Sequence, residues 1–385
     1  MLLYFGIDVH TTNYTVAVYQ PPMIGMVSTE GVYLNVEKLA PESKNVIALV
    51  NQYKKAYGDS LQVILGYEAG CIGASLYRDL TAAKLNCVIL APTTMAVSPV
   101  DRTYKDDKRD AKMIARCLSN QSYKSVYVNT PRDEAVANYV RVRDDAQDRV
   151  KVLKQQTMAY CHRFGFNYHK SYWTKAHYDW FKKLTFENPV AREVLDAYLL
   201  DLQTAIERVE AYDKRIDEFS KEADFSARVA KLGCFLGIST TRALALVAEV
   251  GNFDRFASAD KFASYLGLVP GRHSSGNDNP RLPITKAGNT HLRKELVEAA
   301  QSICKGKIGH KSKELKKRQK GQTEEVIAYA DKGNTRFRKR YYKLIHKGKS
   351  HNVAVVAIAR DLACFIWGMM TNHYSVAGVP DASIA

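Results

Sequence analysis

The first 120 residues alternate between short apolar runs and stretches with helical spacing. Residues 2–9, 15–19 and 32–34 carry the β-branched and aromatic residues typical of strands, and they predict a meander of three strands. Helical spacing at 46–57 is followed by an apolar strand at 62–67, and helices and strands continue to alternate as far as residue 119. Strands that alternate with helices after a meander indicate an α/β layer fold.

From about residue 131 the pattern is helical. Residues 133–163 are helical and rich in charge, and Pro189 is expected to open a second long helix. Apolar residues then recur three and four apart, close to the 3.5-residue period of a coiled coil. They are Leu195, Leu199, Leu202, Ile206, Val209, Tyr212, Ile216 and Phe219. Such a stripe packs within its own chain somewhat more often than against a second copy, and both alternatives stay open.

Two further segments allow a structural and a functional interpretation. Aromatic residues between 164 and 186, interleaved with His and Lys, fit either an aromatic core or a surface on which bases stack. The glycine turn at 232–239 precedes an apolar helix and resembles a helix-hairpin-helix element, whose amides bind phosphate. Ser239 stands where such motifs usually have a second glycine.

The remaining pattern predicts a mostly helical C-terminal part and a three-part chain. A short helix is expected at 260–268, and an apolar helix at 353–370 should return to a core. The predicted class is α/β plus α. The three parts are an α/β domain over 1–130, a helical coiled-coil segment with the aromatic insert over 131–228, and a mostly helical domain over 229–385.

The net charge of the chain predicts a polyanionic partner. The formal net charge of the 385 residues is +16, and residues 285–349 hold 19 Lys and Arg against 6 Asp and Glu. Aromatic rings within this basic region favour nucleic acid over a merely solvated face. The candidate contacts are Lys105, Lys108, Arg109, Arg272, Lys286, Arg293, Lys316, Lys317, Arg318, Arg336, Arg338, Lys339 and Arg340.

Composition also bears on compartment. The seven cysteines are scattered without a Cys-x-x-Cys pair, which fits reduced thiols in a cytoplasmic protein and argues against a structural zinc site. The first residues lack a basic region and run into Asp8, so they indicate a strand and not a signal peptide. No transmembrane helix is expected, because we find no apolar stretch of about 18 residues.

Four carboxylates form the candidate chemistry of the first part: Asp8 and Glu68 after apolar strands, and Asp107 and Asp110 on one face of a helix start. Each alone is an ordinary turn or cap residue, and Asp106 is expected to cap that helix. Together they suit two divalent metals about 4 Å apart, which activate a nucleophile and stabilise a leaving oxygen. Without a cation, two such carboxylates about 4 Å apart repel by about 4 kcal/mol.

A polar loop at 274–280 holds a second candidate group. Taken alone, its serines belong to a surface turn. Arg272 and His273 before it, and further cations after it, provide surroundings that could activate a hydroxyl, which is a weak nucleophile otherwise. The spacing of residues along the chain does not assign a His or Asp to these serines as an activating partner.

These residues together resemble the insertion-sequence-110 family of transposases, which includes the Piv-type DNA invertases. The matching stretches, in the order of the family, are Gly6-Ile7-Asp8-Val9-His10, Tyr67-Glu68-Ala69-Gly70, Lys105 to Ala111, Leu236-Gly237-Ile238, Gly267-Leu268-Val269-Pro270 through Ser275-Gly276, and Ile284 to Asn289 with Leu292-Arg293.

The resemblance implies a RuvC-like domain of ribonuclease H fold, a helical middle segment and a C-terminal transposase domain. It implies Asp8, Glu68, Asp107 and Asp110 as ligands of two Mg²⁺ ions, which Mn²⁺ can replace, and Ser275 as nucleophile, with Ser274 as the adjacent alternative. It also implies a structured bridge RNA that pairs with donor and target DNA, and a cytoplasmic, nucleoid-associated protein.

The sequence therefore predicts a recombinase that excises and inserts an insertion sequence through a covalent serine–DNA intermediate, working as a dimer or tetramer. The first alternative is a RuvC-like structure-specific endonuclease in which water attacks. An ATPase of the actin-like class and a non-catalytic nucleic-acid-binding protein are further alternatives.

Overall fold

A computed structural model describes residues 1–22, 31–58, 60–70, 72–95, 106–271 and 282–374. The chain forms two compact units, Met1–Val128 and Asn129–Ala385. The segments 131–228 and 229–385, which the sequence pattern separates, therefore both belong to the second unit.

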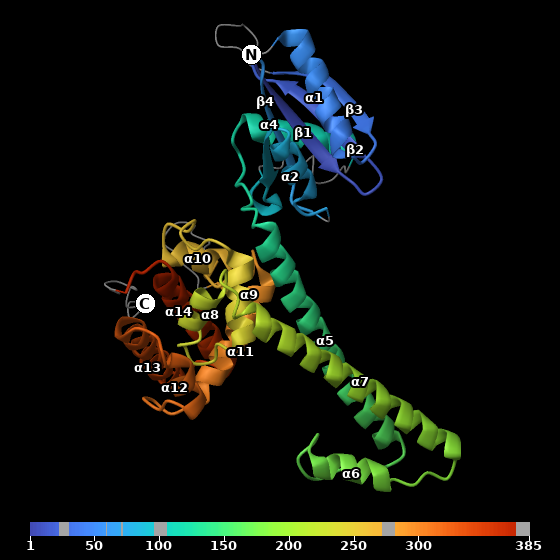
Figure 1. Cartoon of the computed structure of the whole chain (residues 1–385), viewed down its shortest axis with the longest axis vertical. Coiled ribbons are helices and arrows are strands. Elements are labelled where there is room, and N and C mark those ends of the chain that lie inside the picture. Colours follow the sequence, from blue (N-terminus) through green and yellow to red (C-terminus); the bar gives the residue numbers. More distant parts are fainter. Residues whose placement is uncertain (23–30, 59, 71, 96–105, 272–281, 375–385) are drawn as a thin grey trace. The chain divides into compact units, whose positions relative to one another are not determined.

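The first unit contains a five-stranded sheet in the order β3-β2-β1-β4-β5. The meander β1 (Leu2–Val9), β2 (Tyr14–Gln20) and β3 (Val32–Leu39) is antiparallel, while β4 (Gln62–Glu68) and β5 (Asn86–Leu90) continue the sheet in parallel with β1. A mixed α/β unit with a three-strand meander is thus confirmed (Figure 1).

Alternate residues of β1 face two separate cores. Leu3, Phe5 and Ile7 pack with helices α1 (Ser43–Tyr57) and α2 (Ser75–Ala82) on one face. Tyr4 points to the opposite face, where α4 (Asp107–Ser119) packs through residues such as Ile114 and Leu118. The period-2 alternation of the strand therefore gives the sheet a helix layer on each face. A short 3₁₀ helix, η1 (Pro92–Thr94), follows β5.

The second unit begins with two long helices that lie side by side, α5 (Pro131–Arg163) and α7 (Pro189–Phe219) (Figure 1). Five stripe residues of α7 are buried, at Leu195, Leu202, Val209, Ile216 and Phe219. Leu202 and Val209 share an apolar cluster with Val150 of α5. The stripe is therefore covered within the chain, as the first of the two alternatives predicts.

The aromatic segment 164–186 forms a small core at one end of this helix pair. Helix α6 (Lys175–Lys183) contributes Phe181, which is fully buried and packs with Met158 of α5 and Leu195 of α7. His177 is fully buried among the rings. The structure thus favours the core interpretation of this segment, although the ring of Tyr172 stays exposed.

Among the described residues, the rest of the second unit contains seven further helices. They are α8 (Ser226–Leu232), α9 (Thr240–Val250), α10 (Ala259–Tyr265), α11 (Thr290–Cys304), α12 (Lys313–Gln319), α13 (Glu324–His346) and α14 (His351–Met370).

Helix α14 is long and apolar enough to cross a bilayer by length and composition, which corrects the expectation that no stretch of that kind exists. Two thirds of its most apolar window, 67%, is buried inside the protein. It returns to the helical core, as the sequence pattern predicts for 353–370. The six described cysteines are buried as free thiols.

A buried charged network fastens α5, α9 and α11 together. Arg141 of α5 donates two hydrogen bonds of 2.9 Å to the carboxylate of Glu249 in α9, and Asn289, which caps α11, donates a third. His291 of α11 contacts Glu249 through Nδ1 and lies 2.8 Å from Asp144 of α5 through Nε2. Glu249 is thus a buried anion that contacts three polar partners.

The network sets the charge of both titratable groups. Burial alone lowers the pKa of His291, but hydrogen bonds to Asp144 and Glu249 outweigh it and raise the pKa to about 9. Burial alone raises the pKa of Glu249, but the partners outweigh it and lower the pKa to about 2. The helices are therefore joined by an imidazolium between two carboxylates.

We predict that His291→Gln destabilises the protein at pH 6 by about 3 kcal/mol, because it leaves buried carboxylates with one partner fewer. A raised pKa in the folded state contributes stability that is complete below the unfolded value near 6.5 and is lost as pH rises through about 9. Urea unfolding of both proteins at pH 6 and pH 10 measures this. The exposed His346→Gln is the control, and a wild-type advantage that is as large at pH 10 as at pH 6 contradicts the prediction.

Candidate active site

Two predicted carboxylates lie at the carboxyl ends of neighbouring parallel strands. Asp8 is the penultimate residue of β1, and Glu68 is the last residue of β4. The ladder pairs Gly6 with Gly66 and Ile7 with Tyr67, so Asp8 and Glu68 follow at the next register position. Side chains two apart share a face, which places both acids on the face that α4 covers.

Helix α4 brings the other two acids to the same edge. A Cβ at Gly6 would lie 2.2 Å from the carbonyl oxygen of Ala111 in α4, so only glycine allows the helix this close to β1. Asp107 and Asp110, in the first helical turn, are partly buried. Asp106 occupies the cap position, but its side chain makes no capping hydrogen bond, contrary to the expectation.

Two basic side chains that the site prediction lacks contact these carboxylates: His10 contacts both Asp8 and Asp107, and Lys38 contacts Asp107. His10 Nε2 lies 3.0 Å from Asp8 and 3.6 Å from Asp107. Lys38 Nζ, from the end of β3, lies 2.7 Å from the other carboxylate oxygen of Asp107. One ligand atom each from Asp8, His10 and Asp107 lies within 4.8 Å of the others.

The position of Lys38 follows from strand register. Asp8 pairs with Thr15, and Thr15 pairs with Lys38, so the three residues form one row across the meander. The Lys38 hydrogen bond lowers the pKa of Asp107, and the same contact raises the pKa of Lys38. In the middle of the row, the buried hydroxyl of Thr15 has no hydrogen-bond partner among the described residues.

This donor set fits a divalent metal. Carboxylate oxygens are the ligands that Mg²⁺ prefers, and the grouping of Asp8 and Asp107 with His10 supplies three donor atoms at close range. Lys38 offsets part of the negative charge that a metal would neutralise. Asp8, Asp107 and His10 are the described residues whose ligand atoms lie close enough to share a metal, while Glu68 and Asp110 lie outside this grouping.

The predicted nucleophiles Ser274 and Ser275 lie outside the described residues, as do Arg272 and Lys105. The two ends of the serine segment are described and lie together. An isolated bridge joins Pro270 to Ile284, and the Gly271 amide donates to the Pro283 carbonyl over 2.9 Å. The described residues on the two sides of 272–281 are therefore held together in the second unit.

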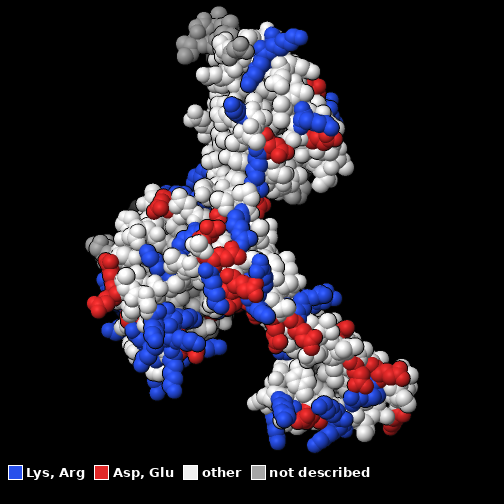
Figure 2. All heavy atoms as spheres, in the orientation of Figure 1, with Lys and Arg blue, Asp and Glu red and all other residues white. Residues whose placement is uncertain are grey.

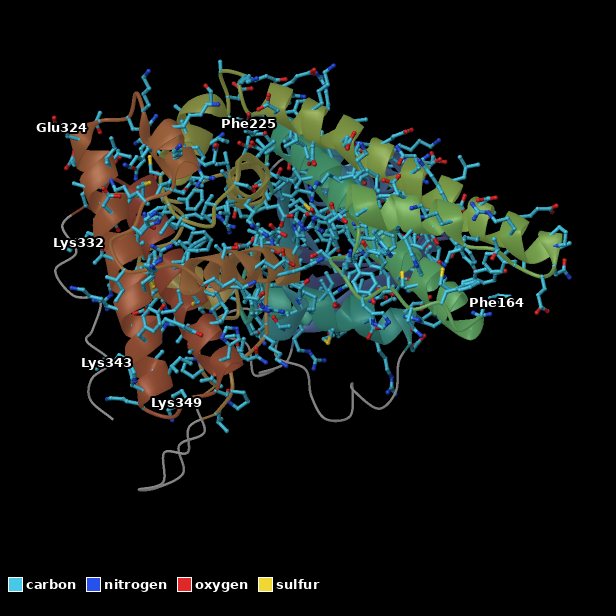
Figure 3. The ribbon with its side chains drawn as sticks, turned by 90° about the horizontal axis from the view of Figure 1, so that it is seen from below. Phe164, Phe225, Glu324, Lys332, Lys343 and Lys349 are labelled. Atoms are coloured by element: carbon cyan, nitrogen blue, oxygen red, sulfur yellow. The ribbon has the colours of Figure 1, made fainter. Side chains whose placement is uncertain are left out.

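The predicted nucleic-acid contacts fall into two groups. Lys108, Arg109, Lys316, Lys317 and Lys339 have exposed side chains. Figure 2 shows Lys and Arg gathered over the region of α12 and α13, and Figure 3 shows Lys332 and Lys343 along α13, with Lys349 beyond its end.

The second group is engaged inside the protein. Arg338 is 5% exposed and donates to the carbonyls of Ile303, Lys307 and His310, so the structure corrects its prediction as a phosphate contact. Arg340 donates to the buried carboxylate of Asp361, and the Nε of Arg336 lies 3.9 Å from the same carboxylate.

Two other predicted contacts lie near the base of the serine segment. Arg293 donates to the carbonyl of Leu266 over 2.9 Å. Lys286 has a positive φ of 54° in the turn that follows the Pro270–Ile284 bridge. Both cations therefore belong to the described surroundings of residues 272–281.

Two family models match separate parts of the chain. Residues 5–161 match a transposase family model of the DEDD type, and residues 231–315 match the model described as Transposase IS116/IS110/IS902 family. The first match contains all four predicted carboxylates, and the second contains the serine segment.

Curated relatives extend over most of the chain. A putative transposase, y4qE, of Sinorhizobium fredii is 34% identical over 309 residues, which are 79% of this chain and 74% of that protein. The transposase for insertion sequence element IS1533 of Leptospira borgpetersenii is 27% identical over 90% of this chain and 98% of its own length. The transposase for IS1111A of Coxiella burnetii is 25% identical over 82% of this chain and 79% of its own length. The chain belongs to the IS116/IS110/IS902 family of transposases and is a DNA transposase.

Proposed function

We propose that this transposase excises and inserts an insertion sequence through a covalent serine–DNA intermediate, with carboxylate-bound divalent metal at a RuvC-like site. The observation that carries the proposal is the convergence of Asp8 and Asp107 from β1 and α4 at one edge of the sheet. Two carboxylates and a histidine at this range suit metal-assisted phosphodiester chemistry.

Asp8, Glu68, Asp107 and Asp110 are the proposed ligands of two Mg²⁺ ions, which Mn²⁺ can replace. When bound, such metals activate a hydroxyl and stabilise a leaving oxygen. The hydroxyl oxygen of Ser275 loses its proton and bonds to the phosphorus, while the DNA strand leaves as a hydroxyl end. A free 3′ hydroxyl of the partner strand then attacks the phosphoserine, which restores the serine and joins the strands.

The exposed cations of α12 and α13 and those of the α4 start are proposed to hold nucleic acid. DNA is the substrate, and the resemblance to the family adds a structured bridge RNA that pairs with donor and target DNA. Strand exchange cuts several strands at once, so a dimer or tetramer is proposed, acting on the nucleoid in the cytoplasm. The alternative, a RuvC-like endonuclease, differs in one step, because water attacks and no adduct forms.

The nucleophile is tested with a DNA substrate that traps the cleaved strand, together with bridge RNA and Mg²⁺. We expect a protein–DNA adduct that survives denaturation for the wild type and for Ser274→Ala, and none for Ser275→Ala, because only Ser275 supplies the attacking oxygen. Adduct in Ser275→Ala moves the nucleophile elsewhere. Cleavage by the wild type without any adduct supports the endonuclease instead.

The carboxylates are tested by charge removal at constant size. Asp8→Asn and Asp107→Asn should each lower the rate of adduct formation by at least about a hundredfold, because metal ligation needs the anionic oxygens. The exposed neighbour Asp106→Asn is the matched control and should keep a rate close to wild type. Chelation by EDTA should stop the reaction, and excess Mg²⁺ should restore it. Equal rates in Asp106→Asn and Asp107→Asn refute the metal assignment.

The RNA partner is tested by omission. Without bridge RNA we expect nonspecific DNA binding through the basic surface to persist, because that attraction is electrostatic, while site-specific adduct formation disappears. A bridge RNA with a changed pairing loop should redirect the reaction to the matching DNA. Specific cleavage of the same site in the absence of RNA would show that the protein reads the DNA itself.

A further inference from the structure

A pocket of about 350 Å³ lies where α7, α8, α9 and α12 meet in the second unit. Hydroxyl groups line it from three elements: Ser220 after α7, Ser226 in α8 and Thr240 in α9. Arg318 of α12 and Lys221 add two positive charges. Among the described residues, no carboxylate lines the pocket, so its chemistry favours an anion.

Arg318 is the unusual member of this lining. Its Nε atom is buried and has no hydrogen-bond partner, and we find no ion pair to its guanidinium among the described residues. Desolvation by burial is the largest influence on its charge, and it lowers the pKa of Arg318. The side chain as a whole is partly exposed. A buried N–H donor without an acceptor nevertheless costs folding free energy, and natural structures retain few of them.

Arg338 shows how the same part of the chain treats a structural arginine. Its guanidinium is buried, and it donates to three backbone carbonyls around the end of α11. Arg340 likewise has a buried carboxylate as its partner, at Asp361. The Nε donor of Arg318 has no such acceptor among the described residues, so it is available to a ligand that enters the pocket.

The start of α9 faces the same pocket through Thr240, the first residue of this 11-residue helix. The Ser239 hydroxyl accepts a hydrogen bond from the amide of Arg242. The amides of Thr240 and Thr241, at the start of the helix, have no acceptor inside the helix. The amide end of a helix dipole attracts anions. Lys221 lies at the rim, where it also pairs with Asp217 over 2.6 Å, so Arg318 and α9 carry most of the attraction.

The structure changes the interpretation of the glycine turn at 232–239. A Cβ at Gly237 would lie 2.4 Å from the carbonyl oxygen of Ala299, so this glycine serves close packing on α11 and not approach to a ligand. Gly233 has ordinary space around it and lines the pocket beside the Arg318 side chain. Phosphate recognition therefore falls to Arg318 and Thr240, two residues 78 positions apart in the chain.

We propose that this pocket binds one backbone phosphate of a nucleic acid, with Arg318 and the first amides of α9 as its donors. The proposal rests on the proposed function in that nucleic acid is the ligand. Lys316 and Lys317, exposed on the same short helix, continue the positive surface beside the pocket. The shared ligand chemistry is a phosphodiester, which either the DNA or the RNA can supply.

The first experiment measures binding without cleavage, in EDTA, by fluorescence anisotropy with a DNA duplex and separately with a structured RNA. Arg318→Met keeps the apolar stem and removes the charge, and we expect about tenfold weaker binding of the nucleic acid that occupies the pocket. The slope of log affinity against log salt should become shallower by the amount that corresponds to about one phosphate contact. If only the affinity for DNA falls, the bound phosphate belongs to DNA. If only the affinity for RNA falls, it belongs to RNA.

Lys317→Met is the charge-matched control for the phosphate probe, because it removes one exposed charge from α12 and leaves the pocket lining intact. The second experiment uses inorganic phosphate as the probe. Phosphate should raise the Tm of the wild type and of Lys317→Met more than chloride at equal ionic strength. Arg318→Met should lose this increment, whereas its own Tm in chloride should equal or exceed the wild-type value, because the substitution removes a buried donor that has no acceptor.

Ala230→Leu provides a second variant that keeps every charge and fills part of the pocket. It should also lose the phosphate increment. Unchanged affinity for both nucleic acids in Arg318→Met, or an intact phosphate increment in that variant, overturns the proposal. Because no step here needs Ser275 or metal, these results are independent of the adduct assay. The proposal for the pocket can therefore be refuted while the serine mechanism is supported, and the serine mechanism can be refuted while the proposal for the pocket is supported.

Discussion

The candidate active site depends on the contact between α4 and β1 at Gly6. The helix backbone lies directly on the strand, and any side chain at this position would meet the carbonyl oxygen of Ala111. A wider separation would carry Asp107 and Asp110 away with the helix, while Asp8 stayed in the strand. An uncharged backbone contact thus sets the spacing of a charged cluster. Displacements of about 1 Å are large for a site that aligns reacting groups.

That spacing has an electrostatic cost, and the sheet itself supplies part of the compensation. Asp8, Thr15 and Lys38 occupy one row across three strands, so the register that builds the sheet also delivers a cation to Asp107. His10 bridges both carboxylates from the turn after β1. The antiparallel meander therefore acts on the site as well as supporting it. A divalent metal would compete with Lys38 and His10 for the same oxygens.

Sequence reasoning located the local features of this protein and missed those that depend on register or burial. The strands, the long helices and the order of the four acids follow from short-range patterns. Lys38 was missed because its proximity to Asp107 requires the pairing of β2 with β3. Arg338 was misassigned because a count of charges does not reveal which cations are buried. The apolar stripe of α7 was found, but its partner α5 could be identified only from the folded chain.

The basic character of the second unit therefore combines cations with different physical roles. Arg141 and Arg340 neutralise buried carboxylates, and Arg338 satisfies carbonyls, so these guanidiniums already have partners inside the protein. Lys316 and Lys317 are exposed and attract phosphate at long range. The buried Nε of Arg318 has no acceptor among the described residues, although the side chain is partly exposed. A phosphate that enters the pocket would supply that acceptor, so we assign this arginine to binding and not to the stability of the fold.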